Sequence, residues 1–150
     1  MKRILISTIA VSALLFNVSC DTNFDQDVSD IVVSKGDADF TKYVALGNSL
    51  TSGYRDNALY IDGQNESYPS MIAKQMKFAG GGEFLQPMMA DNNGGLLLNG
   101  SPIAATKVYL KGFDVLGSPI IENVLAAPTT DITKKVTGAI NNFGVPGAKT

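Results

Sequence analysis

The hydrophobic positions form one long run near the amino terminus and several short runs over the rest of the chain. Residues 4–16 are almost wholly apolar, with only serine and threonine interrupting them. Two later runs, residues 43–46 and 139–143, are short and each is followed directly by glycine, which predicts two buried strands. Between them, residues 69–78 carry apolar side chains at helical spacing, with a proline in the first turn, so we predict a helix there.

The long segment between the two predicted strands combines irregular stretches with one β-hairpin. Residues 83–100 and 126–135 have no sustained period and are expected to be loops. Alternation predicts a strand over residues 106–110, continued towards 115, and a return strand over residues 119–124. Residues 116–119, Leu-Gly-Ser-Pro, form the turn between them. The pattern as a whole predicts an α/β fold whose two core strands flank a long insertion.

The apolar run at the amino terminus predicts a secretory signal peptide over residues 1–19. Lys2 and Arg3 precede the run as a charged region, and the run is shorter than the about 20 residues that a membrane-spanning helix needs. It ends shortly before Cys20, the only cysteine, so no disulfide can form within these residues.

Cys20 follows the small residue Ser19, and this arrangement resembles the lipidation site of a bacterial lipoprotein. The resemblance implies a lipid anchor in the outer membrane of the cell envelope. Such an anchor is firm, because each buried methylene of its acyl chains contributes about 0.8 kcal/mol to membrane binding. Residues 20–39 are rich in aspartate and predict a solvated acidic tether, compatible with display on the cell surface. The alternative is a secreted protein that is cleaved nearby and carries no lipid.

Composition narrows the classes of partner and cofactor. The net charge of the 150 residues is −2 and no basic cluster occurs, so we expect no binding to nucleic acid. The polar run at residues 91–95 lacks the alternating pattern and distal glutamate of a calcium loop, so a solvated loop is expected. Met71 and Met76 of the predicted helix are expected in the core. No metal or cofactor is predicted.

The candidate nucleophile is Ser49, which stands two residues after the glycine that ends the first predicted strand. A strand in this position delivers a hydroxyl to the rim of a sheet, at the start of a helix. The alternative is that Ser49 is simply the N-cap of that helix, a position that serine favours. The 150 residues contain no histidine, so no imidazole within them can take the proton of Ser49.

Two short motifs give this serine a family context. Residues 47–50, Gly-Asn-Ser-Leu, resemble the first conserved block of the SGNH, or GDSL, hydrolases, with Asn48 where aspartate is usual. Residues 142–148, Asn-Phe-Gly-Val-Pro-Gly-Ala, resemble the second block, and Ser-Tyr-Pro at residues 67–69 opens the helix between them. The wide gap resembles a secreted lipoprotein branch of the family with a long insertion. The resemblance covers about residues 43–150.

The resemblance implies a serine ester hydrolase, similar to lipases and esterases, on a flavodoxin-like, three-layer fold. Ser49 takes the place of the nucleophile, and its N–H and that of Gly147 take the places of two oxyanion donors. Gly144 is the alternative donor, Gly147 then being an ordinary turn glycine, and Asn48 is expected to support the binding loop. The family's third donor, an asparagine, and its histidine base belong to later blocks that these residues lack.

We therefore expect residues 40–150 to be the amino-terminal part of an SGNH domain, truncated, with an incomplete parallel sheet and no activity alone. The expected substrate is an ester of unknown type. One alternative is a non-catalytic surface lipoprotein that binds glycans or lipids. A degenerate fragment without function is the other.

Overall fold

The computed structural model describes residues 31–149, and the chain from Val33 onward forms one unit of mutually contacting residues, which is described by itself. The predicted signal peptide, the lipidation site at Cys20 and most of the acidic tether lie outside the described residues. Within them, no helix combines the length and apolar character that crossing a membrane would require.

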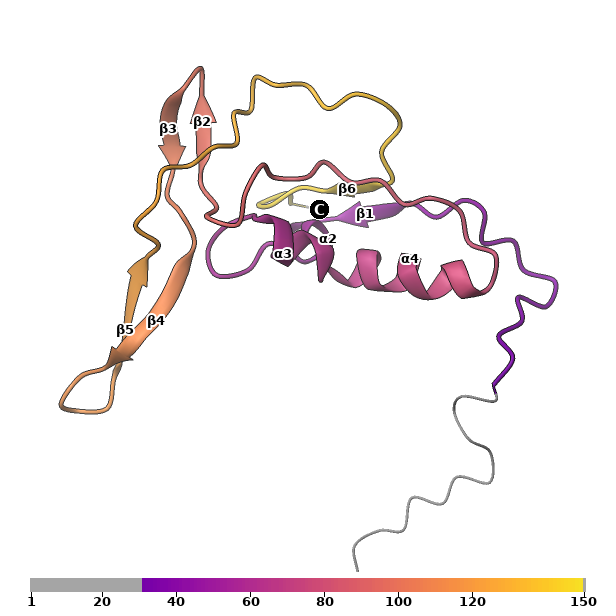
Figure 1. Ribbon diagram of the computed structural model, residues 1–150, viewed down its shortest axis with the longest axis horizontal. Helices are drawn as coiled ribbons and strands as arrows, with labels where there is room; N and C mark the ends of the chain where they lie inside the picture. The colour runs from indigo at the N-terminus through magenta and orange to yellow at the C-terminus, as the bar shows by residue number, and fades with distance from the viewer. Residues whose placement is uncertain (1–30, 150) are drawn as a thin grey trace, which may run out of the picture. The chain divides into compact units, whose positions relative to one another are not determined.

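The centre of this unit is a pair of parallel strands, β1 (Ala45–Gly47) and β6 (Asn142–Gly144), drawn side by side in Figure 1. Ala45 pairs with Asn142, and Gly47 pairs with Gly144. Both strands were predicted, but each begins later and extends to its glycine. The first bond of the ladder runs from the Ala45 N–H to the Asn141 carbonyl at 2.8 Å. The Asn141 N–H is directed away from β1, to the Leu85 carbonyl at 2.7 Å, so strand pairing starts only after it.

Three helices follow β1 in the described part of the chain: a helix starting at Ser49 and a helix over residues 69–78 were predicted, and the third was not. The short α2 (Ser49–Ser52) ends at Gly53, which adopts a left-handed conformation with φ of 81°. A second short helix is α3 (Ile61–Asn65). The predicted helix is present as α4 (Tyr68–Phe78), where the Ser67 hydroxyl accepts the Ser70 N–H and caps the first turn.

The buried face of α4 differs from the prediction. Its buried residues are small: Pro69, Ser70 and Ala73. Met71, expected in the core, is 50% exposed, and Met76 is half-buried. The small side chains allow the helix to lie close to α2 and to α3, which it contacts. The larger apolar side chains are therefore directed away from this contact.

The insertion forms two antiparallel hairpins. The pair β4 (Val108–Phe113) and β5 (Pro119–Asn123) confirms the predicted hairpin and is drawn in orange in Figure 1. The pair β2 (Leu96–Leu98) and β3 (Ser101–Ala104) lies partly in a segment that we expected to be irregular. Its two turn residues, Asn99 and Gly100, have φ of 50° and 80°, as a tight hairpin turn requires. The Asn-Gly pair next to three leucines was the signal for this hairpin.

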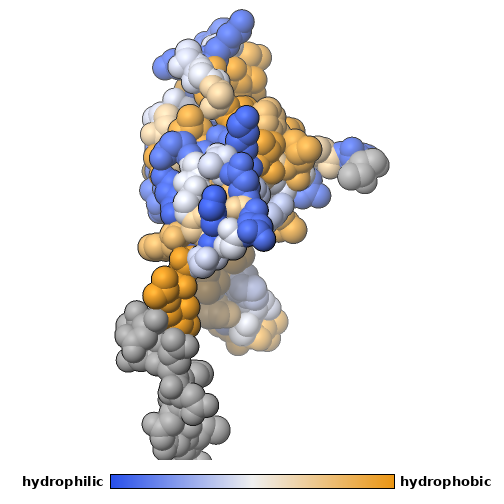
Figure 2. Space-filling model, turned by 90° about the vertical axis from the view of Figure 1, so that its right-hand side faces the viewer, coloured by the Kyte–Doolittle hydropathy of each residue, from blue (hydrophilic) through white to orange (hydrophobic). Residues whose placement is uncertain are grey.

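Many large apolar side chains of the unit are exposed. In the parallel pair, Leu46 and its register partner Phe143 are 74% and 45% exposed, on the face opposite to the buried Ala45 and Asn142. Figure 2 shows apolar surface in orange beside hydrophilic surface in blue on one side of the molecule. The predicted α/β class is confirmed: residues 31–149 form a mixed fold with one parallel and two antiparallel strand pairs. The three-layer, flavodoxin-like arrangement stays a prediction.

Candidate functional site

The parallel pairing of β1 and β6 brings the two motif loops to one edge of the sheet. The Val145 N–H, just past the end of β6, donates to the Gly47 carbonyl at 3.0 Å. Beyond this bond a cavity of about 200 Å³ lies between the two loops. Its walls come from the loop and helix after β1 and from the turn after β6, in the set Gly47, Asn48, Thr51, Ala148 and Lys149.

Ser49 is the first residue of α2 and is half-buried. The N-cap is its neighbour Asn48, whose Oδ1 accepts the Leu50 N–H at 3.3 Å, so the interpretation of Ser49 as the cap is wrong. The Ser49 carbonyl accepts the Tyr54 N–H at 2.9 Å and the Ser52 hydroxyl at 2.8 Å. Its own N–H and hydroxyl have no hydrogen-bond partner among residues 31–149. Both groups are therefore available to a ligand.

Gly147 lies in a tight turn that follows β6. The Ala148 N–H donates to the Val145 carbonyl at 3.1 Å, Pro146 holds the first central position, and Gly147 has φ of 80°. A turn with proline first and a left-handed glycine second is of type II. In the described part of the chain, no group accepts the Gly147 N–H. Gly147 is thus a turn glycine whose N–H has no partner among residues 31–149.

The N–H of Gly144, the alternative donor, already has an acceptor within the protein. It donates to Asn142 Oδ1 at 2.9 Å. A Cβ at this position would overlap the backbone of α2 at Thr51 and Ser52. Close packing of β6 on α2 is therefore sufficient reason for glycine here. Of the two glycines that the sequence singled out, Gly147 is the one whose N–H has no acceptor within the described chain.

A buried polar network, which sequence reasoning did not find, holds the two loops in register. Asn142 is 3% exposed, and its Nδ2 donates to the Thr51 carbonyl at 2.8 Å and to Gln86 Oε1 at 3.1 Å. Gln64, also 3% exposed, donates from Nε2 to the Pro87 carbonyl at 2.7 Å. No buried side-chain polar atom of the described residues lacks a partner. The network links β6, α2 and the insertion, so it supports the site without entering it.

Other chemistry is sparse around these loops. The 150 residues contain no histidine, and residues 31–149 contain no cluster of acidic, histidine or cysteine side chains that could hold a metal ion. A cavity of about 370 Å³ lies between α4 and the segment from Phe84 to Met88 and is lined by no residue of either motif. The arrangement can therefore present a hydroxyl and two N–H donors, and the proton acceptor must come from outside these groups.

No protein-family profile matches the chain, and no curated protein or solved structure is significantly similar to it.

Proposed function

We propose that this chain carries the nucleophile and two oxyanion donors of an SGNH-type serine ester hydrolase. The observation that supports the proposal best is the parallel β1–β6 pair, at one end of which stand a serine hydroxyl and two N–H groups that have no partner among residues 31–149. The order and spacing of the two motifs, which resemble the first two SGNH blocks, agree with this geometry.

In the proposed reaction, Ser49 Oγ attacks the carbonyl carbon of an ester, and the carbonyl oxygen becomes an oxyanion. The N–H groups of Ser49 and Gly147 donate to that oxygen, and backbone donors of this kind are worth about 3–4 kcal/mol each. The Oγ proton passes to a histidine outside these 150 residues, which then delivers it to the leaving alcohol. Water subsequently releases the acyl group from Ser49. The cell envelope, through a lipid anchor at Cys20, is the proposed location.

Serine-directed labelling tests the proposal. The protein is expressed from its native locus, in whatever length its host makes, and membranes are treated with a fluorophosphonate probe. We expect one adduct on Ser49, lost in Ser49→Ala. Ser101→Ala is the matched control, because Ser101 is exposed on β3 and belongs to neither motif. A folded protein that is labelled equally with and without the Ser49 hydroxyl, or not labelled at all, contradicts the proposal.

The absence of histidine favours one alternative, a surface lipoprotein that keeps the two loops for binding. Such a protein would bind glycans or lipids and would give no serine adduct and no ester turnover. Glycan-array and lipid-overlay binding by the unlabelled protein, unchanged in Ser49→Ala, is the outcome that distinguishes this function from the enzyme.

A further inference from the structure

A third cavity, of about 280 Å³, opens beside the type II turn that carries Gly147. Most of its lining is apolar and comes from segments far apart in the sequence: Ala58, Leu59, Met89, Leu96, Ala105 and Pro146. Pro146 is the residue directly before Gly147. Tyr54, which also lines the cavity, donates its N–H to the Ser49 carbonyl at 2.9 Å. The cavity therefore adjoins the second motif at Pro146, and one of its lining residues is hydrogen-bonded to Ser49 of the first.

One wall of this cavity is a tight reverse turn with fixed geometry. Arg55 and Ala58 exchange backbone hydrogen bonds of 3.2 and 3.0 Å, and the two residues between them, Asp56 and Asn57, both have positive φ. That combination defines a two-residue type I′ hairpin turn, which asparagine and aspartate favour. The Asn57 side chain accepts the Tyr54 hydroxyl at 3.1 Å. The wall is thus ordered before any ligand binds.

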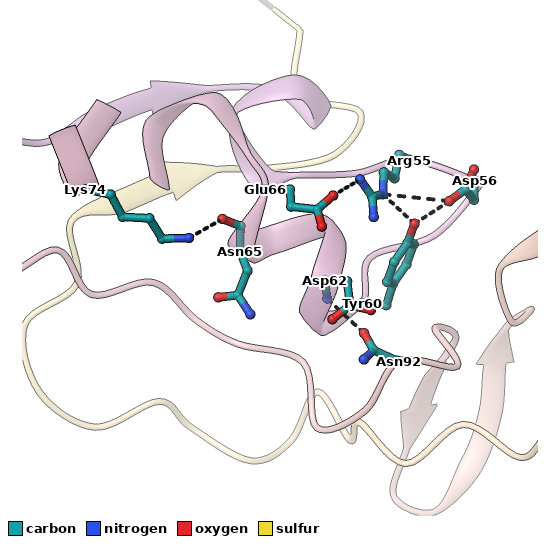
Figure 3. A network of polar contacts seen from close by, with 8 residues as sticks. All are labelled: Arg55, Asp56, Tyr60, Asp62, Asn65, Glu66, Lys74 and Asn92. Atoms are coloured by element: carbon teal, nitrogen blue, oxygen red, sulfur yellow. Dashed lines mark hydrogen bonds and ion pairs between the residues drawn. The ribbon is translucent and has the colours of Figure 1, made fainter. Parts of the chain in front are cut away.

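Figure 3 shows the polar side chains that brace the same turn, none of which lines the cavity. Arg55 donates from Nε to the Tyr60 hydroxyl at 2.5 Å and forms an ion pair with Glu66. Tyr60, buried in the core, donates its hydroxyl to Asp56. Burial raises the pKa of Tyr60 and the hydrogen bond to Asp56 raises it further, so the phenol keeps its proton. The Lys107 ammonium lies 4.0 Å from the ring centroid of Tyr60.

Another part of the lining, around Gly95 and Leu96, follows two adjacent glycines. Gly94 and Gly95 have φ of 73° and 80°. A Cβ on Gly94 would lie 2.7 Å from the Ala58 Cβ, and one on Gly95 would lie 2.8 Å from the Pro128 ring. Glycine at position 94 therefore lets this segment approach the turn at Ala58, and glycine at position 95 lets it pack closely on Pro128.

From these contacts we infer that the cavity binds the acyl chain of the ester, with the carbonyl carbon placed at Ser49. The inference rests on the proposed function and adds the class of substrate, an apolar acyl ester. An apolar lining with few polar groups suits a hydrocarbon chain and gives a sugar ring few hydrogen-bond partners. The volume lies just below the about 300–1,000 Å³ of typical small-molecule sites, so a short or medium chain fits and a long fatty acyl chain does not.

Binding of carboxylates to the Ser49→Ala protein tests the pocket separately from catalysis. The probes are butyrate, hexanoate, octanoate and laurate, and the signal is the methyl resonance of Met89. We expect affinity to increase about fourfold per added methylene, from about 0.8 kcal/mol each, and to stop increasing before laurate. In Ala105→Phe, which fills the cavity from an exposed position, hexanoate affinity should decrease at least tenfold. The matched control, Ala127→Phe, is also exposed but lines no described cavity and should bind as the parent does.

The outcomes separate the pocket from the enzyme. Chain-length-dependent binding that Ala105→Phe removes supports the pocket even when the parent protein shows no ester turnover, which would count against the proposed function alone. Ester turnover that is insensitive to chain length and to Ala105→Phe would overturn the pocket and leave the hydrolase standing. If circular dichroism shows that Ala105→Phe does not fold, the pocket is tested by the Met89 shift and the chain-length series in Ser49→Ala alone. The inference is then refuted if hexanoate leaves the Met89 resonance unshifted.

Discussion

The side chain of Asn142 offers the sharpest test of how the two motif loops are held together. It is 3% exposed and makes three hydrogen bonds, as donor to the Thr51 carbonyl and to Gln86 Oε1 and as acceptor of the Gly144 N–H. In Asn142→Ala these three groups lose their partner in a place that water reaches poorly. A buried polar group without a partner costs about 1–3 kcal/mol. Partial relaxation reduces the sum, so we expect a loss of about 3 kcal/mol in the free energy of unfolding.

Urea denaturation followed by circular dichroism measures this change. A loss of about 3 kcal/mol is a large share of the about 5–15 kcal/mol that stabilises a typical domain, so the midpoint should decrease clearly. Asn65→Ala is the matched control, because Asn65 is exposed and its side chain makes no hydrogen bond with the described residues; its effect should stay within about 0.5 kcal/mol. If Asn142→Ala changes stability by no more than the control does, the polar network does not hold α2 to β6 and the reasoning is refuted.

Two other predictions follow from single contacts. Gly144→Ala should destabilise the protein by at least about 1 kcal/mol, because the added Cβ overlaps the α2 backbone at Ser52. Gly112→Ala, whose Cβ meets open space, should be tolerated. Equal unfolding midpoints for the two variants would contradict this prediction. The pKa of Asp131 should be about 2, below the ordinary 3.8, chiefly because the Thr133 hydroxyl donates to its carboxylate. The stability from this ionised group is complete above pH 3.8 and is lost as the pH decreases through about 2, so parent and Asp131→Asn should differ at pH 5 and converge in acid. A carboxyl resonance that titrates near 4 would count against it.

Local pattern predicted those elements whose stability depends on neighbours in the sequence. The helix α4 was predicted from apolar spacing and a proline in its first turn, and the β4–β5 hairpin from alternation around a Gly-Ser-Pro turn. The β2–β3 hairpin was missed although its Asn-Gly turn was visible, because three leucines are too few to show a period. The buried face of α4 was wrong because helical spacing marks a stripe but does not say which neighbour covers it.

In the candidate site, too, some features could be predicted from the sequence and others depend on the folded structure. The two motifs could be found in the sequence, and the SGNH resemblance rests on them. Which of Gly144 and Gly147 keeps a free N–H could not be found there, because it depends on the Asn142 side chain and on the turn after β6. That Asn48 caps α2 in place of Ser49 likewise depended on where the helix begins in space.

The sequence by itself determined the short apolar strands, the main helix, one hairpin and the two glycine-containing loops, since each follows from periodicity and turn chemistry over a few residues. Only the tertiary structure decided the register in which residues 45–47 pair with residues 142–144, the burial of Asn142 against α2, and the apolar cavity beside Pro146. These features join segments separated by most of the chain, and their free energy comes from contacts that exist only after the chain has folded.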